Sequence, residues 1–564
     1  MFEASNGACI ALFASLLALI VIFGRKKLYP KPYPQIPYNA HSAKRIMGDL
    51  PDLIPAIKAT KANSESIYRI TTQKLGSPIA QLLLPGNPMI ILSDPYEIER
   101  ILRSNQFDKS AWALSVVGPL FSKATLSQLT TPELKAQKKL WGDVMGLDFL
   151  KRTAAPKSYS STVELVELWR LKATTAHKGQ PFNVLEDLKN AALDAIWVSI
   201  VGEKPGTLRY EKRKLEHELK GQQFDDPAPP GSFMKEQVEY IVDTIMDASA
   251  TPFPAWAVKL EVLKPRFRRF RKVVTREMSR AMKKALTRYE GLDLDSLGKD
   301  SIDTCAMDLV LRKQALQAKK AGVEPSDPTK DIAMLDELFV LLIGGHDSTA
   351  NTLAWFIKFM ETFPQAQTEL RAALSSAFGP GIPTLSQILE ADIPYLDAAC
   401  EEALRLSGTS NGVLRSPLQD TTILGYPVPK GSIIYMNIHV NHSSVLADES
   451  QRTETGKAAR QKKDDGFKTP AGRDLGTYEP RRWLVRDETG KEMFNPNALP
   501  QLAFGAGVRM CFGRRLAVMQ FRIAVTLLIL SFEFQEVPEG MQSMACIERL
   551  FRTPQQPYAK LRVL

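Results

Sequence analysis

The fold of this chain is decided by residues 504 to 513, which read Phe504-Gly505-Ala506-Gly507-Val508-Arg509-Met510-Cys511-Phe512-Gly513. Three glycines, one arginine and one cysteine in ten residues indicate a backbone that turns tightly around a single sulfur. Gly505, Gly507 and Gly513 allow the positive-φ turns that point backbone N–H groups inward, and such groups stabilise a thiolate. The apolar run after Gly513 predicts a helix whose N-terminal end would also favour the anion. Cys511 is therefore the candidate metal ligand.

The other four cysteines, Cys9, Cys305, Cys400 and Cys546, are scattered and are interpreted as ordinary buried or spare thiols. No two cysteines form a Cys-x-x-Cys pair, which argues against a disulfide framework and against a structural zinc site. Such cysteine usage is typical of a reducing compartment. We therefore expect the catalytic part of the chain to face the cytosol.

The stretch around Cys511 resembles the Phe-x-x-Gly-x-Arg-x-Cys-x-Gly signature of the cytochrome P-450 family of haem-thiolate monooxygenases, and every specified position matches. The resemblance implies that Cys511 is the axial ligand of haem iron, with haem b (iron protoporphyrin IX) as the cofactor. It also implies that Phe504 packs beside the cysteine loop and that Arg509 hydrogen-bonds a haem propionate. A thiolate ligand pushes electron density onto iron and favours O–O cleavage.

A second constellation lies in the long helical pattern from Asp331 to Phe363, whose middle reads Gly344-Gly345-His346-Asp347-Ser348-Thr349. Adjacent glycines cost about 1 kcal/mol each inside a helix relative to alanine. Their presence predicts that something approaches the backbone closely there or that the helix opens. His346 is interpreted as a helix-face histidine that makes an ordinary hydrogen bond, and not as a metal ligand.

This run resembles the family's Ala/Gly-Gly-x-Asp/Glu-Thr-Thr pattern in the helix that crosses the haem. The resemblance implies that Gly345 lines the cofactor groove and that Asp347 and Ser348, followed by Thr349, relay protons during oxygen activation. Serine in place of threonine keeps the hydroxyl but leaves its rotamer less constrained. We therefore expect the efficiency of the relay to depend on how Ser348 is held.

Three residues resemble a structural clamp of the family. Glu402 and Arg405 stand at i and i+3 of a predicted helix, and such a pair on its own is usually a surface ion pair worth a few tenths of a kcal/mol. The pair resembles the family's Glu-x-x-Arg motif, and residues 478–483 resemble its Pro-x-Arg-Phe/Trp segment. Under this resemblance Glu402, Arg405 and Arg482 hold the cysteine loop in place.

Further haem contacts are predicted at three basic residues. Arg415 is a candidate second partner for a propionate. Lys135 and Lys139 lie in the basic helical turn 135–141, where the family commonly has Trp or His followed by Arg. They would act as point charges, since lysine lacks the bidentate fork of arginine. The alternative for this turn is a solvated basic face.

Composition and the resemblance together predict the fold class. The chain has 564 residues, of which 44% are hydrophobic and 24% are charged, as in an ordinary globular protein with a large core. The expected fold is mainly α with small β-sheets (α+β), namely the cytochrome P-450 fold, with haem between the long central helix and the cysteine-ligand loop. The formal net charge of +11 favours a membrane surface or an acidic partner, because no nucleic-acid motif is present.

The N-terminal segment predicts a single membrane-spanning helix. Ala8 to Gly24 is uncharged and about as long as the shortest spanning helices of about 17 residues. A cleaved signal peptide is the competing interpretation, but residues 1–7 contain Glu3 and no basic residue. Arg25-Lys26-Lys27 follows, which by the positive-inside rule leaves the rest of the chain in the cytosol.

These observations give a domain plan with an anchor over 1–29, a proline-rich hinge over 30–37 and a catalytic domain over 38–564. The expected location is the endoplasmic reticulum membrane, crossed once, with the catalytic domain cytosolic. Residues 250–272 combine an aromatic loop with a dense basic run, which suits contact with anionic lipid as well as it suits a solvated helix face. Residues 448–474 form a charged insertion, for which disorder or a surface loop is expected.

The function predicted from the resemblance is the insertion of one oxygen atom of O2 into a small hydrophobic organic substrate by hydroxylation or epoxidation. Residues 499–504 resemble filamentous-fungal members, many of which act in secondary metabolism. The alternatives are a haem-thiolate isomerase or dehydratase on the same fold and a non-catalytic haem-binding membrane protein. A sensor needs no proton relay, and retention of Asp347 and Ser348 argues against an isomerase.

The expected electron donor is an NADPH-cytochrome reductase, a flavoprotein with FMN and FAD, with cytochrome b5 as a second candidate. Arg514 and Arg515, with Lys138 and Lys139 as neighbours, would form a basic face for such an acidic partner. The remaining expected partners are the small hydrophobic substrate and membrane lipid, with no nucleic acid.

Overall fold

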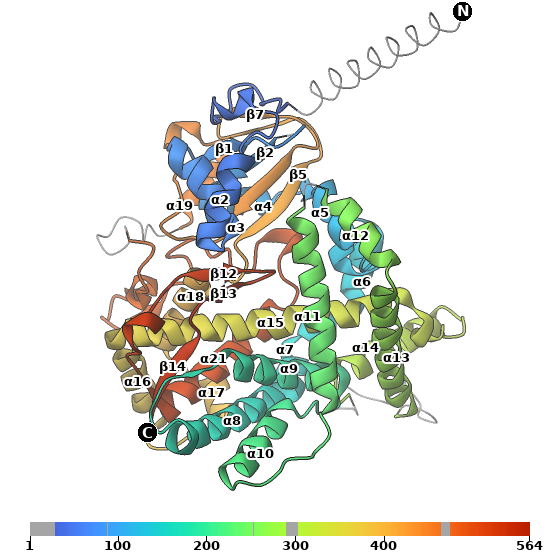
Figure 1. Ribbon diagram of the computed structural model, residues 1–564, viewed down its shortest axis with the longest axis vertical. Helices are drawn as coiled ribbons and strands as arrows, with labels where there is room; N and C mark the ends of the chain where they lie inside the picture. Colours follow the sequence, from blue (N-terminus) through green and yellow to red (C-terminus); the bar gives the residue numbers. More distant parts are fainter. Residues whose placement is uncertain (1–28, 87, 252, 289–302, 464–473) are drawn as a thin grey trace, which may run out of the picture. The chain divides into compact units, whose positions relative to one another are not determined.

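The computed structural model describes residues 29–463, except 87, 252 and 289–302, and residues 474–564 (Figure 1). The predicted anchor helix, Ala8 to Gly24, lies outside these ranges. Within them, every helix is too short or too polar to cross a bilayer. The described chain forms two compact units, one from the parts of 1–110 and 412–462 that are described, the other from those of 111–411 and 463–564. The predicted division into anchor, hinge and catalytic domain stays a prediction.

The first unit is built on a five-stranded sheet with the order β1-β2-β8-β5-β3. β1 and β2 form an antiparallel hairpin, β8 runs parallel to β2, and β5 pairs antiparallel with both β8 and β3. The elements of this unit are α2 (Leu50–Thr60), α3 (Asn63–Tyr68), α4 (Pro95–Arg103), α19 (Glu454–Gln461), β1 (Ile79–Leu82), β2 (Met89–Leu92), β3 (Phe107–Lys109), β5 (Gly412–Pro417), β6 (Thr421–Ile423), β7 (Tyr426–Val428) and β8 (Ile433–Asn437).

The insertion after residue 448 is ordered in its first part, contrary to the expectation of disorder or a surface loop. Its helix α19 packs against α4. The fully buried guanidinium of Arg452 donates to both carboxylate oxygens of Asp94, at 2.8 and 2.6 Å, and lies over the ring of Tyr96. A buried bidentate ion pair of this kind fixes geometry as well as charge. Residues 464–473 of the insertion lie outside the described ranges.

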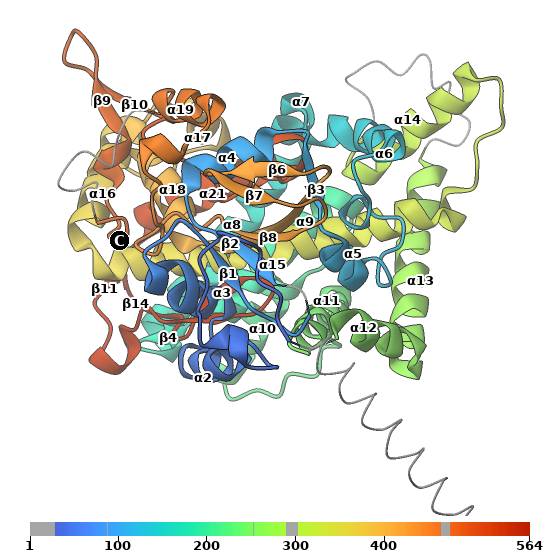
Figure 2. The same ribbon diagram turned by 90° about the horizontal axis from the view of Figure 1, so that it is seen from above.

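The second unit surrounds α15 (Ile332–Thr362), a 31-residue helix coloured yellow in Figure 1. Asp331 begins this helix by accepting hydrogen bonds from the amides of Ala333 and Met334, which is the usual role of an N-cap aspartate. The helix is regular through Gly344 and Gly345, so the predicted opening of its backbone does not occur. In Figures 1 and 2, α16 and α13 lie near opposite ends of α15, and both contact it.

The other elements of the second unit pack around α15, with α9 and α21 both in contact with it. The helices are α5 (Ala111–Val117), α6 (Pro132–Trp141), α7 (Leu147–Phe149), α8 (Ala155–Leu171), α9 (Leu185–Val201), α10 (Thr207–Leu219), α11 (Pro230–Ser249), α12 (Pro254–Leu263), α13 (Pro265–Thr287), α14 (Ala306–Lys320), α16 (Pro364–Phe378), α17 (Leu385–Glu390), α18 (Pro394–Ser407) and α21 (Arg514–Ser531). The strands are β4 (Phe182–Asn183), β9 (Leu484–Arg486), β10 (Glu492–Phe494), β11 (Phe532–Gln535), β12 (Cys546–Glu548), β13 (Arg552–Pro554) and β14 (Tyr558–Val563).

One apolar cluster joins the first half of α15 to the segment after the cysteine loop. Leu342 and Ile343 of α15 belong to it, as does Leu516 of α21, and Phe512 packs against it. The burial of these side chains places the cysteine loop and the middle of α15 on one shared core. The architecture is therefore mainly helical with small sheets, as the sequence predicts.

Candidate active site

The cysteine loop, residues 504–513, is closed by its own backbone. The amide of Cys511 donates to the carbonyl of Phe504 at 2.8 Å. Gly505 and Gly507 have φ values of 64° and 67°, in the region that favours glycine. The prediction of positive φ is wrong for Gly513, which is the N-cap of α21. Its φ of −83° lies in a region that any residue can adopt.

The surroundings of Cys511 affect its thiol in opposite directions. Its side chain is reached by solvent, yet the surrounding protein is dense enough that burial raises the pKa of its thiol. The amides of Gly513 and Arg514 and the charges of Lys138 and Arg514 act in the opposite direction. A solvent-reached thiol walled in by protein, with N–H groups and cations around it, is suited to bind a metal as a thiolate.

The neighbours of the loop hold it on both sides. The guanidinium of Arg514 lies 5.9 Å from the centre of the Phe504 ring. The side chain of Gln501 donates to the carbonyl of Glu401 at 3.0 Å, which ties the segment before the loop to α18. Gln501 has no part in the sequence motif, so only the structure reveals its contribution.

A lysine that the motif comparison did not select for the haem lies beside the loop. The ammonium of Lys138 on α6 donates to the carbonyl of Val508 at 2.7 Å. Burial lowers the pKa of Lys138 and Arg509 lowers it further, whereas Glu337 and Cys511 raise it. Lys138 therefore lies close to both Arg509 and Cys511.

The predicted haem contacts Lys135 and Lys139 differ from Lys138 in their exposure. Both are exposed on α6, whereas Lys138 shares a face with the buried residues Leu134 and Trp141. The spacing 134, 138, 141 corresponds to i, i+4 and i+7, so the inward face was readable from the apolar pattern. Of these three lysines, Lys138 is the one that contacts the cysteine loop, and the haem contacts of Lys135 and Lys139 stay a prediction.

Arg509 is fixed by a segment that follows α5. Its Nη2 donates to the backbone carbonyl of Gln128 at 2.7 Å. The predicted second propionate partner, Arg415, lies in β5 of the other unit, where it is buried and donates to the carbonyl of Leu414. Its role stays a prediction.

The two glycines of α15 face different surroundings. A Cβ built on Gly345 would lie 2.6 Å from Cγ1 of Ile196 on α9, whereas a Cβ on Gly344 would meet nothing within 4 Å. The close approach predicted for the glycine pair is therefore helix packing at Gly345. The open side is at Gly344, and this corrects the assignment of Gly345 to the cofactor groove.

Asp347 and Ser348 divide between these two sides of α15. The hydroxyl of Ser348 donates to the carbonyl of Gly344, one turn earlier, which places it toward the open side. Burial raises the pKa of Asp347, while Lys189 of α9 lowers it and Glu239 of α11 raises it. The Asp347 carboxyl therefore interacts electrostatically with charged side chains of α9 and α11. Thr349 is half-buried at the next position.

His346 does not make the ordinary hydrogen bond that we expected. It is 1% exposed, and neither ring nitrogen has a partner among the described residues. Burial, with smaller contributions from the charges of Lys189 and Lys235, lowers its pKa to about 3. The ring is therefore neutral and belongs to the core on α15, which packs against α9.

Glu402, Arg405 and Arg482 come together in a buried network. Arg405 donates twice to the Glu402 carboxylate, at 2.8 and 2.7 Å, and Arg482 donates at 2.9 Å. The indole of Trp483 donates to the same carboxylate at 2.8 Å, and the amide of Glu479 donates at 3.0 Å. Burial raises the pKa of Glu402, but Arg405, Arg482 and Trp483 outweigh it, so the pKa lies below its usual value. Glu402 and Arg405 are thus no surface ion pair.

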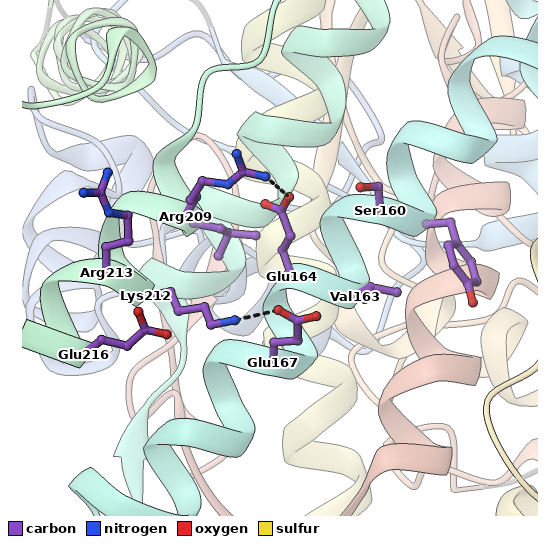
Figure 3. Close-up of a pocket in the computed structure, with 10 residues that line it drawn as sticks. Ser160, Val163, Glu164, Glu167, Arg209, Lys212, Arg213 and Glu216 are labelled. Atoms are coloured by element: carbon purple, nitrogen blue, oxygen red, sulfur yellow. Dashed lines mark hydrogen bonds and ion pairs between the residues drawn. The ribbon is translucent and has the colours of Figure 1, made fainter. Parts of the chain in front are cut away.

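A groove elsewhere in the second unit does not resemble a reaction site. It lies between α8 and α10 (Figure 3), where Arg209 pairs with Glu164 and Lys212 pairs with Glu167. These charges neutralise one another at an open surface. Because such exposed pairs are weak and solvated, they offer no fixed charge to a reactant.

The residues around Cys511 fit a haem. The thiol supplies one axial sulfur ligand, and the cations Arg509 and Lys138 lie beside it to meet two carboxylates. Added Cβ atoms at Gly344 and Gly513 would meet nothing within 4 Å, which leaves open space on α15 and at the loop. In the described part of the chain, no cluster of three or more metal-binding side chains competes with Cys511 as a metal site. The class that this site defines is that of the haem-thiolate proteins.

The comparisons with known proteins identify the family. The cytochrome P-450 family model matches residues 50–445 and 476–561. The cytochrome P-450 monooxygenase TRI13 of Fusarium sporotrichioides is 31% identical over 98% of both chains. The cytochrome P-450 monooxygenase xilC of Penicillium rubens is 29% identical over 94% of this chain and 91% of its own length. The chain belongs to the cytochrome P-450 family, and its relatives confirm the predicted likeness to fungal members.

A solved structure supports the fold alone. A crystal structure of a cytochrome P-450 superposes with a TM-score of 0.65 at 17% identity and covers 95% of this chain and 100% of its own. Because the relatives named monooxygenases match over most of the chain, the protein is a cytochrome P-450 monooxygenase. Family membership implies a haem-thiolate cofactor, an organic substrate and a redox partner.

Proposed function

We propose that this monooxygenase inserts one oxygen atom of O2 into a small hydrophobic substrate, by hydroxylation or epoxidation, in secondary-metabolite biosynthesis. The observation that supports this proposal best is the division of labour on α15, with Ser348 on the open side and Asp347 toward a charged cluster. A haem-thiolate isomerase or dehydratase needs no such proton supply. An apolar pocket accepts many small organic molecules, so the substrate class is proposed only as hydrophobic.

The proposed cofactor is haem b. Cys511 would hold its iron, and Arg509 and Lys138 would hold its carboxylates, with Phe504 packed beside the loop. When bound, the haem with its thiolate ligand supplies the activation of dioxygen. Glu402, Arg405 and Arg482 would keep the loop rigid from behind, a structural role.

Protons would reach the open side of α15 through Asp347. Glu186 and Glu239 have half-exposed carboxylates, and both pair with the nearly buried ammonium of Lys189, at 3.4 and 3.7 Å. The charge of Lys189 in turn lowers the pKa of the Asp347 carboxyl. The two glutamates are thus more exposed than Lys189, which would connect the surface to Asp347. Ser348 would pass protons onward, with Thr349 as the next hydroxyl.

Electrons would come from NADPH through a flavoprotein reductase that contains FMN and FAD, with cytochrome b5 as a second donor. Lys135 and Lys139 on α6 and Arg514 and Arg515 at the start of α21 are exposed on elements that hold the cysteine loop. Such a basic face suits an acidic partner by electrostatic steering. Lys135 and Lys139 are thus accessible for this surface.

The proposed location is the endoplasmic reticulum membrane, crossed once near the N-terminus, with the catalytic domain in the cytosol. Exposed apolar side chains on α12 and on the residue before it also support membrane contact. Large apolar side chains are 61–67% exposed there, namely Phe253, Trp256, Leu260 and Leu263. Lys259 lies over the Trp256 ring at 5.4 Å, and the basic start of α13 follows. Exposed apolar and basic groups together are typical of binding to anionic lipid.

The reduced carbon monoxide complex of the purified protein tests the proposal. We expect the red-shifted Soret band of a thiolate ligand in the wild type. Cys511→His should keep the circular dichroism of the fold but lose this band and all oxygenation. Cys546→Ala should keep the band and the oxygenation activity. A wild type without the band would refute the thiolate assignment. NADPH consumption that does not respond to any hydrophobic substrate, with substrate still rearranged, would favour the isomerase.

A further inference from the structure

We propose that Glu337 is a positioning residue for Arg509, acting through Gln137 and Gln128, so that the central helix sets the place of the cation that would hold the haem carboxylate. Glu337 lies on α15 two turns before Gly344, and it is part of no motif described above. The inference rests on the proposed function in one respect, namely that Arg509 holds a haem carboxylate. The contacts from Glu337 to Arg509 are hydrogen bonds within the second unit and do not depend on haem.

Glu337 is a buried carboxylate turned toward the 118–131 segment. It is 4% exposed, and it accepts from the amide of Thr125 at 2.8 Å and from the hydroxyl of Thr125 at 2.7 Å. It also accepts from the side-chain amide of Gln137 on α6 at 3.1 Å. A buried carboxylate needs such donors, because an unpaired one would be too costly to keep ionised. Glu337 therefore determines where Thr125 and Gln137 lie.

From Gln137 the chain of contacts continues to the cysteine loop. The side-chain oxygen of Gln137 accepts from Nε2 of Gln128 at 2.7 Å, and the backbone carbonyl of Gln128 accepts from Nη2 of Arg509 at 2.7 Å. Both ends of the Gln137 amide are therefore in use, one toward Glu337 and one toward Gln128. This places Gln137 as the link between α15 and the residue that fixes Arg509.

The neighbouring acid holds the beginning of the same segment. Asp336 is 0% exposed and accepts from the amide of Lys123 at 3.2 Å and from Arg271 of α13 at 2.7 Å. Gln128 also donates to the carbonyl of Lys123 at 2.6 Å. The segment is thus held at Lys123 by Asp336, at Thr125 by Glu337 and at Gln128 by Gln137. Its carbonyl at Gln128 is consequently a rigid partner for Arg509.

Substitution at the link tests the proposal with a readout that needs no turnover. We expect Gln137→Leu to speed the transfer of haem from the full-length protein to apomyoglobin about tenfold, which corresponds to about 1.4 kcal/mol. Gln128→Leu removes the bonds of its half-buried side chain to Gln137 and to the carbonyl of Lys123 but keeps the backbone carbonyl that accepts from Arg509, and it should give a smaller increase of the same sign. Gln317→Leu, the same change at an exposed position of α14, should leave the rate unchanged.

A double-mutant cycle separates positioning from a general loss of stability. If Gln137 acts through Arg509, the variant Q137L/R509Q should lose haem no faster than R509Q alone. Glu337→Gln should behave nearly as the wild type, because an amide can accept from both N–H groups and donate to the Thr125 hydroxyl. Rates that multiply in the double variant would overturn the proposal.

Amide hydrogen exchange gives a measurement that does not depend on haem. Q137L should increase exchange in residues 118–131 and also in residues 504–513, whereas Q317L should change neither. Unchanged exchange in 504–513 would refute the connection even if the protein bound no haem. A wild type that lacks the thiolate band would refute the proposed function instead, so the two failures are distinguishable.

Discussion

At the scale of single residues, Ser348 is the position where this chain departs from the threonine of its family. Its hydroxyl is held by the carbonyl of Gly344, which restrains a side chain that would otherwise rotate more freely than threonine. The backbone carbonyl thus does part of what a γ-methyl group does elsewhere. The oxygen remains on the open side of the helix.

Substitution of Ser348 tests its place in the proton relay. Ser348→Ala should lower the product formed per NADPH several-fold and raise peroxide release by a matching amount, because protons then arrive through a less ordered route. Ser348→Thr keeps the hydroxyl and should couple at least as well as the wild type. Ser376→Ala, an exposed serine of α16, is the control. An unchanged yield per NADPH in S348A would count against the relay.

The sequence predicts residue roles where a motif specifies the chemistry, as for Cys511 and for the acid and alcohol of α15, and these roles stay predictions. The direction of a side chain could not be predicted in this way. Lys135, Lys138 and Lys139 are chemically identical, and only the packing of Leu134 and Trp141 turns Lys138 inward. Gly344 and Gly345 differ in the same way, because α9 contacts only one of them closely. The spacing of residues within one helix does not show which distant segment packs against each of its faces.

At the scale of the elements, the packing of α15 on α9 depends on the missing side chain of Gly345. The added Cβ would lie 2.6 and 2.7 Å from Cγ1 and Cδ1 of Ile196. Contacts this short are not observed between packed side chains, so one helix would have to move. The neighbouring glycine has no such restriction.

The two adjacent glycines therefore make a matched pair for stability measurements. We expect Gly345→Ala to lower the free energy of unfolding by about 1–3 kcal/mol, as overpacking usually does. Gly344→Ala should raise it by up to about 1 kcal/mol, because alanine is the better helix former. Urea denaturation followed by circular dichroism measures both.

A second substitution identifies the cause of the loss. Ile196→Ala removes the atoms that the new methyl would meet, so I196A/G345A should be less destabilised than the sum of the single variants. Additive losses would show that Ile196 is not the obstacle.

The existence and length of α15 could be predicted from its apolar period. The docking of α19 through Arg452 could not, since its partner Asp94 lies far away in sequence.

At the scale of the whole molecule, the charge of +11 is not spread evenly. Basic residues are frequent beside the cysteine loop and at the start of α13, where α12 exposes its apolar side chains. The proposed reductase and the proposed membrane would thus be met by two different basic surfaces. Net charge and composition predicted both kinds of partner, but only exposure shows which residues are available to each.

Lipid contact of α12 can be measured in the full-length protein inserted into vesicles. Brominated phospholipids should quench the fluorescence of Trp256, which is exposed. Trp256→Phe should remove most of the quenching, because other tryptophans, such as Trp169, Trp355 and Trp483, are buried in the core. Vesicles that contain anionic lipid should quench more than neutral ones. Equal quenching of wild type and W256F would contradict lipid contact at α12.

The network at Glu402 also bears on how the gene can change. The carboxylate on α18 is completed by donors some 80 residues later, namely Arg482 and Trp483, and the insertion lies between them and α18. The segment before residue 462 is fixed to Asp94, and the carbonyl of Asp474 accepts from Arg482. Arg452 and Arg482, which frame this stretch on its two sides, are therefore expected to change less in evolution than the exposed residues around them.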